Sequence, residues 1–371
     1  MAVILVAGFA AWFRTTRPGY RLERGLQAAR QGDFVKANEY ANLLERAGDN
    51  DHAFLLRGET QFLQNEPLQA LSTLNRIKSE GSDVHLEAVY VSGRCWIALR
   101  NLHDAERAFS YVIDARPDHV DARRGLASIY YDLGDYIKAI AVLEEVARLD
   151  PKDGRALRLI GLMYKDMQKI DEAVPAYEES LKRDPNPSDA ADVRLELAEC
   201  LLAKARPNDV IRILESDHSP SAEAFRAEAL IQRGQVDEAT ALLDEALKAN
   251  PDHNVLRRLR AERYRFANNP AAGARLLEDV VIKNPSDFRS REQLALCYGA
   301  IGKTSEAAEQ LQKVKDTQEL VREIHEKSKE AMLNTWEPKV RFQLAELFEK
   351  LGRPELSQMW RKAAQACREA Q

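Results

Sequence analysis

The chain has 371 residues, 45% of them hydrophobic and 30% charged, so it can bury a large core and does not have the composition of a disordered protein. Asp and Glu (59) outnumber Lys and Arg (54), which gives a net charge of −5. A protein that neutralises nucleic-acid phosphates would carry a basic surplus. The composition therefore argues against nucleic acid as the partner of the whole chain.

The chain begins with an apolar segment, "MAVILVAGFAAWF", followed by "RTTRPGY". This segment is short for a membrane span, which needs about 20 residues. Trp12 and Phe13 followed by Arg14 and Arg17 are typical of the interfacial end of a membrane helix. Three interpretations stay open: the second half of a longer anchor, a short anchor as written, or an apolar helix that covers the following residues. We expect membrane association through residues 2–13, on a side that the sequence leaves open, with a cytoplasmic protein as the alternative.

Proline marks a fixed interval along the rest of the chain. Pro117, Pro151 and Pro185 are 34 residues apart, and so are Pro251 and Pro285. Ala105, Ala139 and Ala173 keep the same step, and Ala239 and Ala307 are two steps (68 residues) apart. A period of this length is the signature of a repeat architecture.

The stretch that follows Pro151 shows how one repeat is built. Leu157, Ile160 and Tyr164 share one face of a first helix. A turn follows the first helix. In the preceding repeat this turn reads "DLGDY" (132–136), where Gly134 can take a positive φ after a helix. A second helix carries Ala173 and Tyr177, and a proline stops it. Four prolines are predicted to lie in the first turn of second helices: Pro67, Pro207, Pro270 and Pro354.

With these residues the chain resembles the tetratricopeptide repeat (TPR) family, whose 34-residue pattern places Leu-Gly, Tyr, Gly, Ala, an aromatic residue, Ala and Pro in order. The repeat 154–187 matches with Ile160, Gly161, Tyr164, Ala173, Tyr177 and Pro185. We count about ten repeats, which start near residues 18, 51, 86, 120, 154, 191, 220, 254, 288 and 338. The resemblance implies an all-α fold, a right-handed superhelical α-solenoid of about ten helix hairpins.

The pattern divides the chain into four segments. They are an apolar N-terminal segment and candidate anchor (1–17), an array of about nine repeats (18–317), an extra charged connecting helix (318–337), and a degenerate C-terminal capping repeat (338–371).

No motif for catalysis is visible: there is no phosphate-binding glycine loop, no nucleophile elbow and no HExxH pattern. The four cysteines, Cys95, Cys200, Cys297 and Cys367, form no CxxC spacing, and we expect buried thiols, no metal site and no cofactor. His119 and His253 occupy equivalent places in "RPDHVDARR" and "NPDHNVLRR" and are predicted to be turn residues rather than metal ligands.

We therefore interpret the chain as a bacterial, membrane-tethered scaffold without enzymatic activity, which binds other proteins through a concave groove. The alternative is a structural or assembly subunit of a larger envelope- or secretion-type complex, which packs through its terminal repeats. An exposed apolar stripe around Trp336 and Trp360 would favour this alternative.

In the TPR family the groove is lined by fixed positions of the first helices. Carried over to this chain, these positions hold Tyr90, Arg94, Arg124, Tyr131, Arg155, Arg158 and Lys165. The hypothesis is a basic groove that grips an acidic or C-terminal peptide segment, because Arg matches the geometry of carboxylates. The alternative is that these are solvated residues paired with nearby carboxylates such as Asp121, Asp132 and Asp166.

Chaperone-binding members of the family hold a C-terminal carboxylate with a Lys and two Asn residues in the first helix. Here Arg124 or Arg158 stands at the Lys position, but the Asn positions carry Gly125 and Ser128 in one repeat and leucines in the next. The carboxylate clamp is therefore incomplete.

Overall fold

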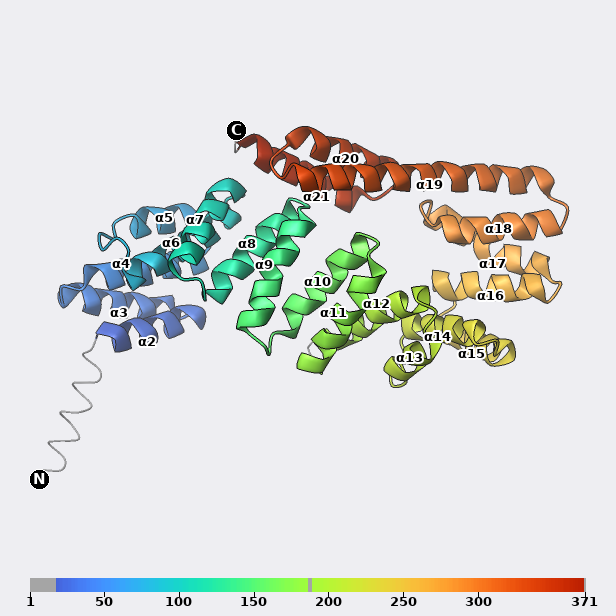
Figure 1. Ribbon diagram of the computed structural model, residues 1–371, viewed down its shortest axis with the longest axis horizontal. Coiled ribbons are helices and arrows are strands. Elements are labelled where there is room, and N and C mark those ends of the chain that lie inside the picture. Colours follow the sequence, from blue (N-terminus) through green and yellow to red (C-terminus); the bar gives the residue numbers. More distant parts are fainter. Residues whose placement is uncertain (1–17, 186–188, 370–371) are drawn as a thin grey trace, which may run out of the picture. The chain divides into compact units, whose positions relative to one another are not determined.

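The structure is a computed structural model that describes residues 18–185 and 189–369. Within these residues all regular structure is helical, with twenty helices, α2 to α21, and no strand (Figure 1). The helices follow one another as hairpins, which confirms the all-α solenoid. First helices start at residues 18, 50, 83, 120, 154, 190, 220, 254, 288 and 338, and the largest departure from the predicted starts is 83 against 86.

The chain divides into two compact units, one of Met1–Leu133 with Gln365–Gln371 and one of Gly134–Ala364, here named unit 1 and unit 2. The helices of unit 1 are α2 (Pro18–Arg30), α3 (Phe34–Arg46), α4 (Asn50–Leu63), α5 (Pro67–Leu74), α6 (Asp83–Ala98), α7 (Leu102–Ala115) and α8 (Val120–Asp132).

Unit 2 contains the remaining helices, of which the last, α21, ends beyond it. They are α9 (Tyr136–Leu149), α10 (Gly154–Asp166), α11 (Ile170–Arg183), α12 (Ala190–Ala203), α13 (Pro207–Ile213), α14 (Pro220–Gln232), α15 (Val236–Ala249), α16 (Asn254–Phe266), α17 (Pro270–Lys283), α18 (Phe288–Ala300), α19 (Thr304–Leu333), α20 (Pro338–Lys350) and α21 (Pro354–Glu369).

The helix boundaries follow the local chemistry of the sequence. Each of the four prolines predicted for a first turn is the first residue of its helix, in α5, α13, α17 and α21. Gly134, in the predicted turn "DLGDY", has a φ of +72°, and Gly234 and Gly302 in the equivalent turns have φ of +79° and +82°, which a residue without Cβ adopts readily. His119 and His253 precede α8 and α16, and in each the ring Nδ1 accepts a backbone N–H of the following turn. Their prediction as turn residues is confirmed.

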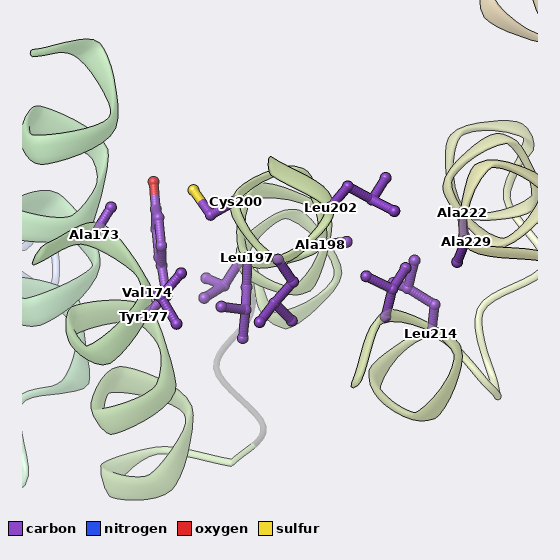
Figure 2. Close-up of a cluster of buried hydrophobic side chains, with 13 residues drawn as sticks. Ala173, Val174, Tyr177, Leu197, Ala198, Cys200, Leu202, Leu214, Ala222 and Ala229 are labelled. Carbon is purple, nitrogen blue, oxygen red and sulfur yellow. The ribbon is translucent and has the colours of Figure 1, made fainter. Parts of the chain in front are cut away.

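Within unit 2, the core continues from one hairpin to the next. Figure 2 shows α12 with Leu197 and Cys200 directed toward Tyr177 of α11, and with Leu202 directed toward the neighbouring α14. Tyr177 lies 3.0 Å from the place where a Cβ on Gly161 would be, so the small residue lets the aromatic ring sit against its own first helix. Each hairpin thus buries its faces against its neighbours, as in other repeat proteins.

The longest helix, α19, runs over 30 residues without a break. It contains the second helix of the ninth repeat and continues through the stretch predicted as an extra connecting helix, so residues 318–333 are its second half. This half is rich in Lys and Glu and buries few residues, among them Ile324 and Ala331.

The prediction of a membrane-associated localisation needs correction. Residues 1–17, on which it rested, lie outside the described residues. In the part of the chain that is described, no helix combines the length and the apolar character that crossing a bilayer requires. The physical reason is plain, because α19 is long but charged and the other helices have 7 to 16 residues against the about 20 needed.

Candidate functional site

The first helices of successive repeats contact one another, so they lie on one face of each unit, here called the inner face. In unit 2, α10 contacts α12, α12 contacts α14, α14 contacts α16 and α16 contacts α18; in unit 1, α4 contacts α6 and α6 contacts α8. The residues predicted to bind a peptide all lie on these helices. Tyr90 and Arg94 belong to α6, Arg124 and Tyr131 to α8, and Arg155, Arg158 and Lys165 to α10.

Arg94 is held by the preceding repeat. Its Nη1 donates to both carboxylate oxygens of Glu59 on α4, at 2.9 and 2.8 Å, and the Glu59 side chain is 5% exposed. The guanidinium also lies 4.3 Å from the ring centroid of Phe62. Arg94 therefore joins two neighbouring first helices, and its charge is neutralised by a carboxylate that is almost fully buried.

The other predicted residues of unit 1 are also engaged. The ring of Tyr90 packs 4.9 Å from that of His119 and 6.0 Å from that of Phe109, and burial raises the pKa of its hydroxyl. Arg124 pairs with Asp121 one turn earlier on the same helix, at 2.7 Å. Tyr131 is half-buried on α8. The sequence offered pairing with a nearby carboxylate as the alternative to peptide binding, and for Arg124 the structure shows such a pair with Asp121.

In unit 2, α10 is tied to α12 by two basic residues. Arg158 donates from Nη2 and Nε to the two carboxylate oxygens of Glu196, at 3.0 and 3.3 Å, and from Nη1 to Asp189. Lys165 donates to Glu199 at 3.0 Å. Arg155, by contrast, has an 82% exposed side chain, with its Nε 4.0 Å from Asp153.

These ion pairs shift the pKa values of the groups around them. The hydrogen bonds that Arg158 donates to Glu196 raise the pKa of its guanidinium. Burial alone would lower the pKa of Lys165, but the hydrogen bond and charge of Glu199 outweigh it and the net shift is upward. The pKa of Asp166 is raised, mainly because its charged form loses solvation and also because Glu196 and Glu199 are near. This part of the inner face therefore carries balanced charge rather than a basic surplus.

The sequence reasoning missed Glu59, Glu196 and Glu199 as partners, because it considered only carboxylates close in sequence. The relevant spacing is about one repeat: Glu59 and Arg94 are 35 positions apart, Lys165 and Glu199 are 34 apart. A search for opposite charges one period apart on the groove positions would have found both pairs.

A pocket of about 790 Å³ lies along the inner face of unit 2. Its lining residues come from α10 to α18. Its charged side chains are Lys165, Glu199, Glu228, Arg258, Arg289 and Glu292, and its apolar ones include Ile170, Leu202, Ala224, Phe225 and Val255. Lys165 is the one residue of the predicted binding set that lines it.

Three polar groups of this pocket are available to a ligand: the side chains of Arg289, Glu292 and Gln293. Arg289 and Glu292 are exposed and make no hydrogen bond or ion pair within the described residues, whereas Arg258 is paired with Glu228 at 3.4 Å. The Oε1 of Gln293 is buried in the pocket wall without a hydrogen-bond partner there. A buried carbonyl oxygen of this kind is costly to leave unsatisfied, which suits an incoming donor.

In the part of the chain that is described, no group of three or more His, Cys, Asp or Glu side chains could hold a metal ion. The four cysteines are buried. Burial raises the pKa of Cys95 to about 12 and that of Cys200 to about 11, so these two thiols stay protonated near neutral pH.

Comparison with known proteins supports the repeat assignment. One tetratricopeptide-repeat model matches residues 97–154 and 258–319, and a second matches residues 165–216. Among curated proteins, the chain is 27% identical over 137 residues to the protein CTR9 homolog of Arabidopsis thaliana, which covers 36% of this chain and 13% of that protein. It is 23% identical over 247 residues to the DnaJ homolog subfamily C member 7 homolog of Schizosaccharomyces pombe, covering 61% and 51%. The chain thus spans 13% of the length of the first of these relatives and 51% of the second.

The chain also resembles solved structures over about half of its length. MamA from Desulfovibrio magneticus RS-1 is 20% identical, with 52% of this chain and 95% of that one covered and a TM-score of 0.38. YrrB, described as a TPR protein with an unusual peptide-binding site, is 17% identical, with 50% and 97% covered and a TM-score of 0.40. The matched segments and the series of helix hairpins together show that this chain carries tetratricopeptide repeats.

Proposed function

We propose that the chain is a protein-interaction scaffold that binds an extended peptide or a helix of another protein along the inner face of unit 2. The observation that carries this proposal is the pocket of about 790 Å³, which crosses five successive first helices. A ligand that contacts several repeats gains from many weak contacts on a surface that is already formed.

The chemistry of the pocket favours a ligand with both charge signs. Lys165, Arg258 and Arg289 are balanced there by three glutamates, and Lys165 and Arg258 already have carboxylate partners. The partially exposed Phe225 and Val255 offer an apolar surface between the charges. The ligand that fits is a peptide with an apolar anchor, an acidic group that reaches Arg289 and a basic group that reaches Glu292.

The predicted grip on a purely acidic peptide is less favoured by this arrangement. A peptide carboxylate would have to displace Glu59 from Arg94, or Glu196 from Arg158, and leave a part-buried carboxylate unpaired. The full predicted set of seven residues therefore stays a prediction, and we place the primary contact at the pocket of unit 2.

The alternative of a structural subunit that packs through its last repeat is not favoured by a specific observation. Trp360 is 4% exposed and Trp336 is half-buried, so they do not form the exposed apolar stripe that would have supported it.

The test uses the full chain and a display library of random short peptides. Enriched peptides are then measured against a Val255→Asp, Arg289→Glu double variant. We expect affinity to fall at least about tenfold, as it does when an anchoring contact is lost from an interface. The matched control is Val236→Asp on α15. Val236 and Val255 both lie in the first turn of a helix and are similarly exposed, at 41% and 38%, but only Val255 lines the pocket.

Equal binding to wild type and to the double variant would place the ligand elsewhere on the chain. A library in which no peptide is enriched over the blank surface would argue against a peptide-binding groove in unit 2.

A further inference from the structure

Unit 2 contains a contact between residues that are 200 positions apart, although repeats in a solenoid normally contact only their neighbours. The Oγ1 of Thr335, in the turn after α19, donates to Oδ2 of Asp135 just before α9. Oγ1 of Thr335 also accepts a hydrogen bond from Nζ of Lys138 at 2.7 Å. That Nζ lies 3.3 Å from Oδ2 of Asp135. The three side chains form a closed triangle of polar contacts.

Burial sets this triangle apart from the equivalent turns. Asp135 caps α9, accepting the backbone N–H of Lys138 at 3.2 Å, and its exposed fraction is 0%. At every other second helix of the described residues, the capping residue is exposed or half-buried. A carboxylate is costly to bury unless its partners are in place. Asp135 is fully covered here because Thr335 and Lys138 supply those partners.

An aromatic ring covers the residue next to the triangle. A Cβ on Gly134 would lie 2.8 Å from Cζ3 of Trp360, on α21. Gly234 and Gly302 occupy the same turn in later repeats, with similar positive φ, and have no atom within 4 Å of the corresponding place. Gly134 is buried, whereas these two are exposed. The Trp360 contact is thus specific to one turn of the array.

The length of α19 makes this contact reachable. A helix of 30 residues spans about 45 Å, far more than the second helix of an ordinary repeat. Figure 1 shows α19 leading from α18 back along unit 2 toward the last hairpin. The extension beyond the ninth repeat therefore has a structural consequence, which is to bring Thr335 and Trp360 to the start of α9.

We propose that Thr335 and Trp360 act as a clasp on Gly134 and Asp135, in the turn before α9, and on Lys138 in the first turn of α9. The clasp closes the repeats of unit 2 into a loop and fixes the curvature of its inner face. With the clasp closed, the distances between successive first helices, from α10 through α12, α14 and α16 to α18, are fixed. With it open, the array is free to extend, as solenoids with only neighbour contacts can. The clasp is independent of the proposed peptide binding and can be tested without a ligand.

The first experiment compares Gly134→Ala with Gly234→Ala and Gly302→Ala in the full chain. All three variants carry the same backbone strain, because each glycine has a positive φ. Only Gly134→Ala also places a methyl group against Trp360. We expect it to raise the radius of gyration in small-angle X-ray scattering and to lower the urea midpoint beyond the shift of the two controls. Equal behaviour of all three variants would overturn the clasp.

The second experiment replaces Thr335 by Val, which keeps the shape of the side chain and removes its hydroxyl, so that the fold is retained. Amide hydrogen exchange is then measured for peptides that cover residues 134–140 and, as a control, the equivalent residues 234–240. We expect exchange at 134–140 to become about tenfold faster, as for the loss of one buried hydrogen bond, with the control unchanged. Unchanged exchange in both peptides would mean that Thr335 does not hold the array closed.

Discussion

The glycine positions of the first helices permit a sharp test of how the repeats pack. Phe109 on α7 is fully buried between Gly93 on α6 and Gly125 on α8. A Cβ on Gly93 would lie 2.7 Å from Cε1 of the ring, and a Cβ on Gly125 would lie 2.6 Å from Cε2. The ring is therefore enclosed from both sides, and it cannot move away from one helix without approaching the other.

The free energy of unfolding should fall in the Gly93→Ala variant. The new methyl group would be about 0.7 Å closer to the ring than ordinary van der Waals contact, and overpacking of a core typically costs about 1–3 kcal/mol. Replacing a helical Gly by Ala recovers about 0.5–1 kcal/mol of this. Because the ring is enclosed from both sides, the overpacking cost should be about 1.5–3 kcal/mol, which leaves a net loss of about 0.5–2.5 kcal/mol. In a Phe109→Leu background, where the ring is absent, the same Gly93→Ala change should be neutral or stabilising.

The assay is urea denaturation followed by far-ultraviolet circular dichroism for the four chains of this double-mutant cycle. Gly299→Ala on α18 is the control, because a Cβ there meets no atom within 4 Å and should stabilise by about 0.5–1 kcal/mol. The coupling energy between positions 93 and 109 should be about 1.5–3 kcal/mol, at the upper end for residues in contact. Additive effects of Gly93→Ala and Phe109→Leu would refute the close approach on which the reasoning rests.

Three further outcomes are expected. Glu59→Gln should destabilise by about 1–3 kcal/mol in urea denaturation, because the guanidinium of Arg94 loses its charged partner, whereas Glu45→Gln at an exposed pair should leave the midpoint nearly unchanged. His253→Ala should cost about 1 kcal/mol at pH 8, through loss of a helix cap, and less at pH 5. Burial lowers the pKa of His253 below its usual 6.5, so its contribution is complete above pH 6.5 and is lost as the pH falls through the folded-state pKa; urea titrations at the two pH values check this. Finally, Cys95 should resist thiol reagents at pH 8 until the chain unfolds, since it is buried and its pKa is about 12; labelling in the presence and absence of urea measures this.

The hairpins could be predicted because many of the repeats carry a glycine or a proline at the turn between their two helices. Gly134 and Gly302 end first helices by taking a positive φ, and Pro67 and Pro207 begin second helices. Such signals act over a few residues, and the sequence displays them directly. The continuous helix over 304–333 was harder to predict, because the repeat pattern ends near residue 317. The sequence itself has no glycine or proline that would interrupt the helix there.

The candidate site was less predictable, because it depends on distances between repeats. The pattern placed Arg94, Arg158 and Lys165 on first helices, as the structure does. It did not reveal that each is paired across the inner face, since the partner carboxylates belong to the neighbouring repeat. Nor could it reveal the clasp, because Asp135 has the sequence of an ordinary helix cap and Thr335 is 200 positions away.

The pairs between repeats have a consequence for how specificity is encoded in this chain. Because Arg158 and Lys165 on α10 meet Glu196 and Glu199 on α12, the charge that a ligand meets is decided by two repeats together. A single substitution on one of these helices releases an opposite charge on the next and so changes both stability and binding. Arg289 lies outside this constraint, because its side chain has no partner within the described residues, and it can change the groove without disturbing the array. Binding preference should therefore be tuned at exposed positions such as Arg289, while the paired positions hold the first helices in register.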